Sequence, residues 1–190
     1  MGWTVTPWLR KNWIGLVAVA VLLPATLGIT FWQQWVGFFD SRPSAPIEVV
    51  GADTAHYGGT AWSLESVERI SFSSAEGKEI GLPADTDLVV ATLNVEPEEF
   101  DNDGKSFGCT VHLQELDGDT ELLSIGDALL DPIDYSFPDD VEWGCNSEVT
   151  EPYLAQTIFI VPSGAGTDGT RLGMSVSVVD ELPDYLRFTL

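Results

Sequence analysis

The feature that most constrains this chain is an uncharged stretch near its N-terminus. No charged residue lies between Lys11 and Asp40, and the twenty residues from Trp13 to Trp32 read WIGLVAVAVLLPATLGITFW. A helix of about 20 residues, rising about 1.5 Å per residue, crosses the roughly 30 Å hydrocarbon layer of a bilayer. Tryptophans cluster at both ends of the stretch, as in the aromatic belts of membrane helices. The sequence therefore predicts one transmembrane helix over residues 13–35.

Two other interpretations of this stretch stay open, a buried core helix and a cleaved signal peptide. A signal peptide has an apolar region of about 7–15 residues and a cleavage site of small residues. Here the apolar run is longer, and cleavage near Thr26 and Gly28 would leave ITFWQQWVGFF as an apolar new terminus. Pro24 would break a soluble helix, but a membrane helix tolerates it. An uncleaved anchor is the favoured interpretation.

The charges that flank the helix predict its orientation. Arg10 and Lys11 precede it, and Arg42 is the one base that follows closely. The positive-inside rule places the side richer in Lys and Arg in the cytoplasm. Four segments follow: a cytoplasmic N-terminus at 1–12, the transmembrane helix at 13–35, a linker at 36–46 that includes SRPSAP, and an extracytoplasmic domain at 47–190.

The region after the helix is strongly acidic. All 30 acidic residues lie at or beyond Asp40, together with six of the eight bases, so this part carries a formal charge of −24. Binding of nucleic acid needs a basic face, so nucleic acid is not an expected partner. The 44% of hydrophobic residues in the whole chain argue against disorder. We expect the membrane and another envelope or membrane protein to be the partners.

Hydrophobic residues alternate with polar ones along most of the acidic region, which is typical of β-strands with one buried face. Gly- and Asp-rich turns such as Asp117-Gly118 separate these segments, and none of them indicates a long helix. The sequence therefore predicts a mainly β domain, an immunoglobulin-like antiparallel β-sandwich. The predicted strands cover residues 47–50, 61–72, 89–95, 107–113, 121–125, 154–161, 172–178 and 186–190.

Four segments carry a resemblance to a known kind of protein. They are AWSLESVE at 61–68, DLVVATLNVEPEE at 87–99, GCTVHLQELDGD at 108–119 and IFIVPSGAG at 158–166. Together they resemble bacterial membrane-anchored, extracytoplasmic immunoglobulin-like β-sandwich proteins of uncharacterised function. The chain is less similar to the small anchored subunits that accompany envelope lipid transporters. The resemblance implies an architecture and an accessory role, and it identifies no ligand.

The two cysteines are a candidate disulfide. Cys109 lies on a predicted strand, and Cys145 lies in a long connection before the next strong strand. One pair of cysteines in an extracytoplasmic domain favours a disulfide, with two separate thiols as the alternative. A catalytic pair of Cys109 and His112 is not expected, because residues three apart on a strand point to opposite faces.

The acidic segment EPEEFDNDG partly matches the pattern of a calcium-binding loop. Glu99, Asp101 and Asp103 match the first, third and fifth positions of an EF-hand loop, but Thr110 stands where the bidentate Glu is needed. A turn that carries solvated carboxylates is the favoured interpretation, with Ca²⁺ binding as the alternative. No cofactor is predicted.

The connection from Gly126 to Glu151 is long and mixes acids with apolar side chains. Connections longer than about 15 residues are often functional. Its Tyr135, Phe137 and Trp143 are the candidate partner surface, and the alternative is a cover packed on the domain itself.

The sequence thus favours a single-pass envelope protein with a non-catalytic exterior domain that binds or positions another envelope component. Two alternatives stay open, an accessory subunit of a membrane transporter and an acidic extracytoplasmic hydrolase. No motif supports the hydrolase.

Overall fold

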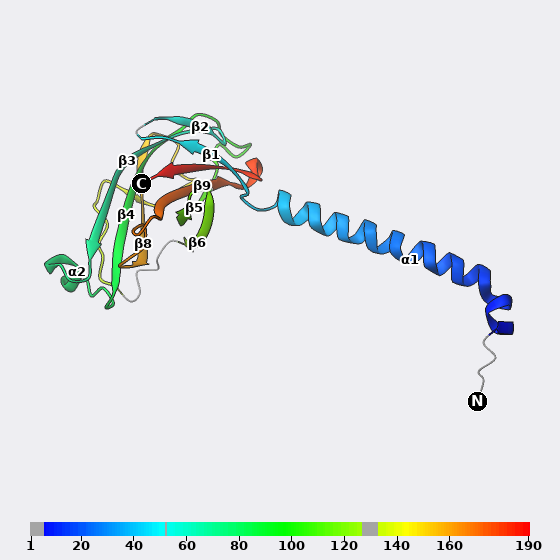
Figure 1. The fold of residues 1–190 in the computed structure, drawn as a ribbon. Coiled ribbons are helices and arrows are strands. Elements are labelled where there is room, and N and C mark those ends of the chain that lie inside the picture. Colours follow the sequence, from blue (N-terminus) through cyan, green and yellow to red (C-terminus); the bar gives the residue numbers. More distant parts are fainter. Residues whose placement is uncertain (1–5, 52, 127–132) are drawn as a thin grey trace. The chain divides into compact units, whose positions relative to one another are not determined.

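The computed structural model describes residues 6–51, 53–126 and 133–190. The chain forms two compact units, Met1–Arg42 and Pro43–Leu190, which are described separately. The first unit is a helix and the second is made mostly of strands (Figure 1).

Helix α1 covers Thr6–Asp40, 35 residues, and so extends beyond both ends of the predicted span. Its segment Pro7–Phe38 is long and apolar enough to cross a membrane by length and composition, and none of its most apolar part is buried. Pro24 lies inside the helix. The hydroxyl groups of Thr26 and Thr30 donate to carbonyls one turn earlier, at 2.7 and 2.9 Å. These polar side chains therefore have partners within the helix, as a lipid environment requires.

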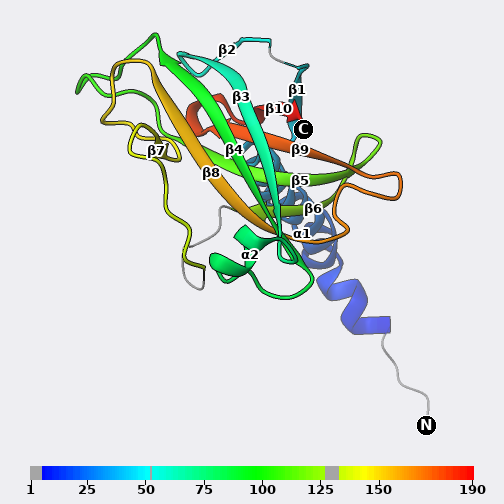
Figure 2. The ribbon, with the colours of Figure 1, turned by 90° about the vertical axis from the view of Figure 1, so that its left-hand side faces the viewer.

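The second unit is a sandwich of two five-stranded sheets (Figures 1 and 2). In sheet A the strand order is β1-β10-β9-β5-β6, and in sheet B it is β2-β3-β4-β8-β7. The strands of sheet A are β1 Ala45–Val49, β10 Asp184–Thr189, β9 Arg171–Val178, β5 Cys109–Asp117 and β6 Thr120–Gly126. Those of sheet B are β2 Ala55–Tyr57, β3 Thr60–Ser71, β4 Thr86–Pro97, β8 Tyr153–Pro162 and β7 Glu142–Trp143.

The predicted mainly β sandwich is confirmed, and every predicted strand overlaps a strand of the structure. The central strands pair antiparallel, as β3 with β4 and β5 with β9. Two edge pairs are parallel instead, β1 with β10 and β7 with β8. The sequence did not predict β2 or β7, which are three and two residues long. The immunoglobulin-like assignment stays a prediction.

The main core lies between the two sheets and follows the predicted alternation. Leu93 on β4, Phe159 on β8, Met174 on β9 and Phe188 on β10 are fully buried in one cluster. Trp62 on β3 joins them, 1% exposed, and its ring nitrogen donates to the carbonyl of Tyr57 at 2.9 Å. A buried indole needs such a partner, so Trp62 belongs to the core and is no candidate for ligand stacking.

A second apolar cluster lies on the outer face of sheet B. Its buried members are Ile70, Leu88, Val90, Ile133 and Ile158. The strand residues among them alternate with the residues that face sheet A, so they point the other way. The short helix α2, Ala75–Glu79, begins at the cap Ser74, whose side chain accepts the N–H of Gly77 at 2.9 Å. Ile80 and Leu82, just after this helix, pack against the cluster.

Candidate functional site

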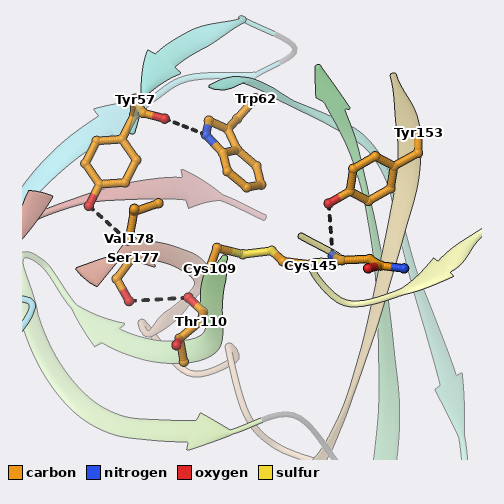
Figure 3. The surroundings of a disulfide bond; sticks show 9 residues. Tyr57, Trp62, Cys109, Thr110, Cys145, Tyr153, Ser177 and Val178 are labelled. Atoms are coloured by element: carbon orange, nitrogen blue, oxygen red, sulfur yellow. Dashed lines mark hydrogen bonds between the residues drawn. A yellow bond between two sulfur atoms is a disulfide. The ribbon is translucent and has the colours of Figure 1, made fainter. Parts of the chain in front are cut away.

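The candidate site lies at the edge of the sandwich where Cys109 and Cys145 form a disulfide (Figure 3). Their Cα atoms are 5.6 Å apart, within the usual range for a disulfide. Cys109 begins β5 of sheet A, and Cys145 follows β7 of sheet B by two residues. The predicted disulfide is therefore present in the structure, and it ties one sheet to the other.

Two tyrosines hold the backbone on either side of the disulfide. The hydroxyl of Tyr153 accepts the N–H of Asn146 at 3.1 Å, next to Cys145. The hydroxyl of Tyr57 accepts the N–H of Val178 at 3.2 Å and donates to the carbonyl of Asp184 at 2.7 Å. Burial is the main cause that raises the pKa of both tyrosines, so their hydroxyls stay protonated at physiological pH. The disulfide is therefore set in a rigid part of the domain.

A hollow of about 240 Å³ lies beside the disulfide and is lined by residues of both sheets. Thr110 and His112 of β5 line it, with Gly144 and Cys145 after β7 and Thr157 of β8. Thr157 lies in the register of Ala155 and Phe159, so it faces the space between the sheets. It is 2% exposed, and its hydroxyl has no hydrogen-bond partner. A buried hydroxyl without a partner is costly, which makes this hollow a candidate binding site.

A second hollow, of about 380 Å³, adjoins the first, because Cys109 and Thr110 line both. Its other walls include Phe107 before β5 and Val179 after β9. The two hollows together follow the first residues of β5. We call them the disulfide groove.

The groove borders the first residues of β5. Cys109, Thr110 and Val111 pair with Val178, Ser177 and Val176 of β9. The groove was not predicted from the sequence. A sequence signal for the groove was Thr157, a polar residue at a position of β8 where the alternation predicts a buried apolar side chain.

The three predicted partner-surface residues lie together at the outer face of sheet B. The rings of Tyr135 and Phe137 meet edge to face at 5.3 Å, and Phe137 stacks on Trp143 at 6.0 Å. Tyr135 and Phe137 pack against the second apolar cluster, and the Tyr135 hydroxyl donates to Gln156 at 3.1 Å. Burial is the main cause that raises the pKa of Tyr135. Trp143 is 50% exposed. Tyr135 and Phe137 thus contribute to the cover of sheet B, and the partner-surface role stays a prediction.

The acidic turn at Glu99, Asp101 and Asp103 is held together by hydrogen bonds from its own backbone N–H groups. The Asp101 carboxylate accepts the N–H of Asp103 at 2.8 Å and that of Lys105 at 2.9 Å. Lys105 pairs with Glu148, and the hydrogen bond that its ammonium donates to this carboxylate is the largest cause that raises the pKa of Lys105. In the described part of the chain, no group of three His, Cys, Asp or Glu side chains is placed to hold a metal ion. The structure does not bring the predicted Ca²⁺ candidates together.

The two histidines lie on different sheets, His56 on β2 of sheet B and His112 on β5 of sheet A. His56 contacts the carboxylate of Glu98 at 3.0 Å on the exposed surface. His112 points to the face of β5 opposite to that of Cys109, whose sulfur is bonded to Cys145. The groove therefore offers hydrogen-bonding and apolar contacts, which suit binding.

No protein-family model matches this sequence, and no curated protein matches it either. Among solved structures, an uncharacterized β-sandwich protein from Clostridium difficile 630 is similar to it, with 8% identity over 77% of this chain and 95% of the other, at a TM-score of 0.42. A "putative lipoprotein" from Staphylococcus aureus is 13% identical over 74% of this chain and 90% of its own, at a TM-score of 0.43. These neighbours are bacterial β-sandwich and lipoprotein-type proteins without established function, in agreement with the expected resemblance. The β-sandwich fold is assigned from the strand pairing of this chain itself.

Proposed function

We propose that this chain is a single-pass envelope protein whose β-sandwich, on the outer side of the membrane, binds or positions another envelope component without catalysis. The observation that carries the proposal is one chain that combines an unburied apolar helix with a domain whose two sheets are joined by a disulfide. Disulfides form and persist outside the cytoplasm. Arg10 and Lys11 before the helix favour the same orientation.

The acidity of the domain supports a binding role with a basic or neutral component. With thirty acids against six bases from Asp40 onward, the domain is repelled by anionic polymers and attracted to basic surfaces. Binding is the function that the groove supports, since its walls supply a hydroxyl, sulfur and apolar contacts.

Topology is tested by adding a protease to spheroplasts that express the full chain with a tag after Leu190. We expect loss of the C-terminal tag while a tag placed before Met1 stays protected. A C-terminal tag that survives, while a known outer-face protein in the same sample is digested, would exclude the exterior placement.

The binding role is tested by crosslinking in native membranes, followed by purification of the chain and mass spectrometry. We expect one envelope protein to be recovered in amounts close to those of the chain itself. Turnover of a glycan or peptide by the purified chain would instead favour the hydrolase, and a polytopic transporter as the crosslinked protein would favour the transporter subunit.

A further inference from the structure

We propose that the edge of β3 at residues 67–71 binds an extended segment of a partner protein as an added strand. The partner segment would place apolar side chains toward the sandwich and basic side chains outward. This inference rests on the proposed function and deepens it, because it names the surface and the chemistry of the partner.

The first support is the length of β3 relative to its neighbour β2. β3 covers 12 residues, and β2 pairs only with residues 60–62 of it (Figure 2). The chain is described without a gap over residues 53–126, so β2, β3 and β4 are followed along their whole lengths. Among the described strands, none pairs with this side of β3 after Trp62. Val67 on the edge is 40% exposed, so it is accessible to a segment from outside.

The second support is the direction of the backbone groups of β3. The N–H of Phe72, just after the strand, donates to the carbonyl of Thr86 at 3.2 Å, so Phe72 faces β4. In an antiparallel ladder the groups of successive residues point to opposite sides. The N–H and C=O groups of Val67 and Arg69 and the N–H of Ser71 therefore point away from β4. An added strand would pair with these groups.

The third support is a hollow of about 270 Å³ beside this edge, lined by residues of both sheets. Val67 and Leu172 are among its aliphatic walls, and Arg69 and Arg171 are its charged ones. Val67 lies opposite the core residue Ala91 in the ladder, so its side chain is on the face of sheet B that faces sheet A. Every second side chain of an added strand would lie on that face, and one of them would enter the hollow.

The charged groups around the hollow already have partners. Arg69 pairs with Asp87 at 2.8 Å, and Arg171 lies 3.6 Å from a carboxylate oxygen of Asp119. The carboxylate of Glu115 accepts hydrogen bonds from two residues that line the hollow. A further charge buried there would lose water without gaining a new partner, which is costly. The aliphatic walls therefore select an apolar side chain.

Charge complementarity selects basic side chains on the other face of the added strand. Glu65 and Glu68 of β3 are exposed, and the domain carries a formal charge of −24 from Asp40 onward. Lys or Arg in the partner segment would be attracted to these carboxylates, and the attraction weakens with salt. Two copies of this chain paired through β3 would bring their like charges together, so a second copy is not the expected occupant.

The test uses the full chain in detergent micelles and three labelled seven-residue peptides. One alternates Val with Lys, one has Lys at every position, and one alternates Val with Glu. Fluorescence anisotropy measures their affinities. We expect the Val/Lys peptide to bind most tightly and to weaken as salt is raised, because it alone combines apolar side chains for the hollow with outward bases. Tighter binding of either other peptide would overturn the proposal.

Backbone pairing is tested with two methylated forms of the Val/Lys peptide, one carrying methyl groups on the Val nitrogens and one on the Lys nitrogens. Alternate N–H groups of a strand point to the same side, so only one form loses the donors that face β3. That form should bind roughly ten-fold more weakly or worse, and the other should keep most of its affinity. Equal affinities of the two forms would overturn the proposal.

Val67→Pro removes an N–H that points to the added strand and leaves the bonds to β4 in place, as an edge strand tolerates. Val67→Ala is the matched control, since it shortens the same side chain and keeps the N–H. We expect a ten-fold or larger loss of peptide affinity for Val67→Pro and a smaller loss for Val67→Ala, with circular dichroism confirming that both fold. Wild-type affinity in a folded Val67→Pro chain would overturn the proposal. If Val67→Pro does not fold, the methylated peptides decide.

Native-membrane crosslinking of the same variants tells the two proposals apart. If the partner is captured equally by the wild-type and Val67→Pro chains, the β3 edge is not the binding surface but the proposed function stands. If neither chain captures a partner, the proposed function fails as well. A wild-type dimer that separates on Val67→Pro substitution would assign the edge to a second copy and overturn the choice of a basic partner.

Discussion

The outer faces of the two sheets are closed in different ways. Sheet B is covered by apolar side chains from the residues just after α2 and from the connection that follows β6, which build the second cluster. Sheet A carries a polar row instead, centred on Arg187 of β10, which is only 4% exposed. Its guanidinium donates to Gln114 and Glu48, each at 3.0 Å, and to the hydroxyl of Tyr185.

The difference shows how a sheet without a cover of its own can still bury its outer face. Arg187 lies across Gly173 of β9, where an added Cβ would come within 3.1 Å of Leu116 and 3.6 Å of the Arg187 stem. The tight contact at this glycine is with Leu116, and the long stem of Arg187 packs at ordinary contact distance beside it. Leu116 and Tyr185 are buried beside it. The side chain of Arg187 thus helps to bury the outer face of sheet A, whereas the outer face of sheet B is buried by a covering segment of the chain.

The largest expected effect comes from removing the disulfide that holds the far end of the sheet B cover. The double variant Cys109→Ser, Cys145→Ser frees a loop with a sequence separation of 36, which should lower the free energy of unfolding by about 4 kcal/mol. Denaturant unfolding of the full chain measures this loss. Hydrogen exchange should rise more in the cover than in β10. A uniform rise over both faces would contradict the role of the disulfide in holding the cover.

Arg187→Ala should have the next largest effect, about 3 kcal/mol, because it leaves the buried partners Gln114 and Tyr185 unsatisfied. The value is at the low end because the partner Glu48 is 41% exposed. Arg171→Ala is the matched control, since Arg171 pairs with an exposed carboxylate and its loss should cost less than about 1 kcal/mol. Equal losses in the two variants would show that the polar row adds no stability.

Phe137→Ala tests the apolar cover of sheet B directly. The ring packs on the second cluster but is only partly buried, so we expect a loss of about 2 kcal/mol in the free energy of unfolding. Trp143→Ala should cost less, because half of that side chain is exposed. Binding of the crosslinked partner is measured for both variants. Reduced capture by Trp143→Ala at unchanged stability would support the partner-surface prediction, and a stable Phe137→Ala chain would contradict the cover.

The smallest effect concerns Glu115 on β5, a surface polar contact of sheet A. Hydrogen bonds from the Thr170 hydroxyl at 2.7 Å and the Gly166 N–H at 3.1 Å lower the pKa of this carboxylate. Its stabilisation is therefore complete above the unfolded value of about 4.5 and is lost as pH falls through the lower folded pKa. Glu115→Gln should flatten the pH dependence of stability below about 4.5. Asp117→Asn is the control, and an identical effect of the two variants would contradict the role of these hydrogen bonds.

The strands were predictable because burial between two sheets imposes a period of two on each of them, as in Met174 and Val176. The outer faces were not. Arg187 stands between two core residues, where alternation predicts solvent, and it is buried because Gln114, Glu48 and Tyr185 surround its guanidinium. The sequence did not decide between a cover and a partner surface for the segment over sheet B. A segment that packs without forming a strand has no regular hydrophobic pattern that would identify it. The groove was missed because its lining residues come from strands far apart in the sequence.

The parallel pairing of β1 with β10 has a mechanical consequence. Five residues of β1 are in register with the last strand, and the N–H groups of Ser44 and Ala45 both donate to the carbonyl of Pro183. Since α1 ends at Asp40 and β1 begins at Ala45, tension applied through the helix reaches the domain first at β1. The bonds to β10 are then loaded together in shear instead of opening one after another. In single-molecule pulling, we expect the force that unfolds the domain to be higher when it is applied at residue 43 than when it is applied at residue 190. A lower unfolding force at residue 43 would contradict the loading of these bonds in shear.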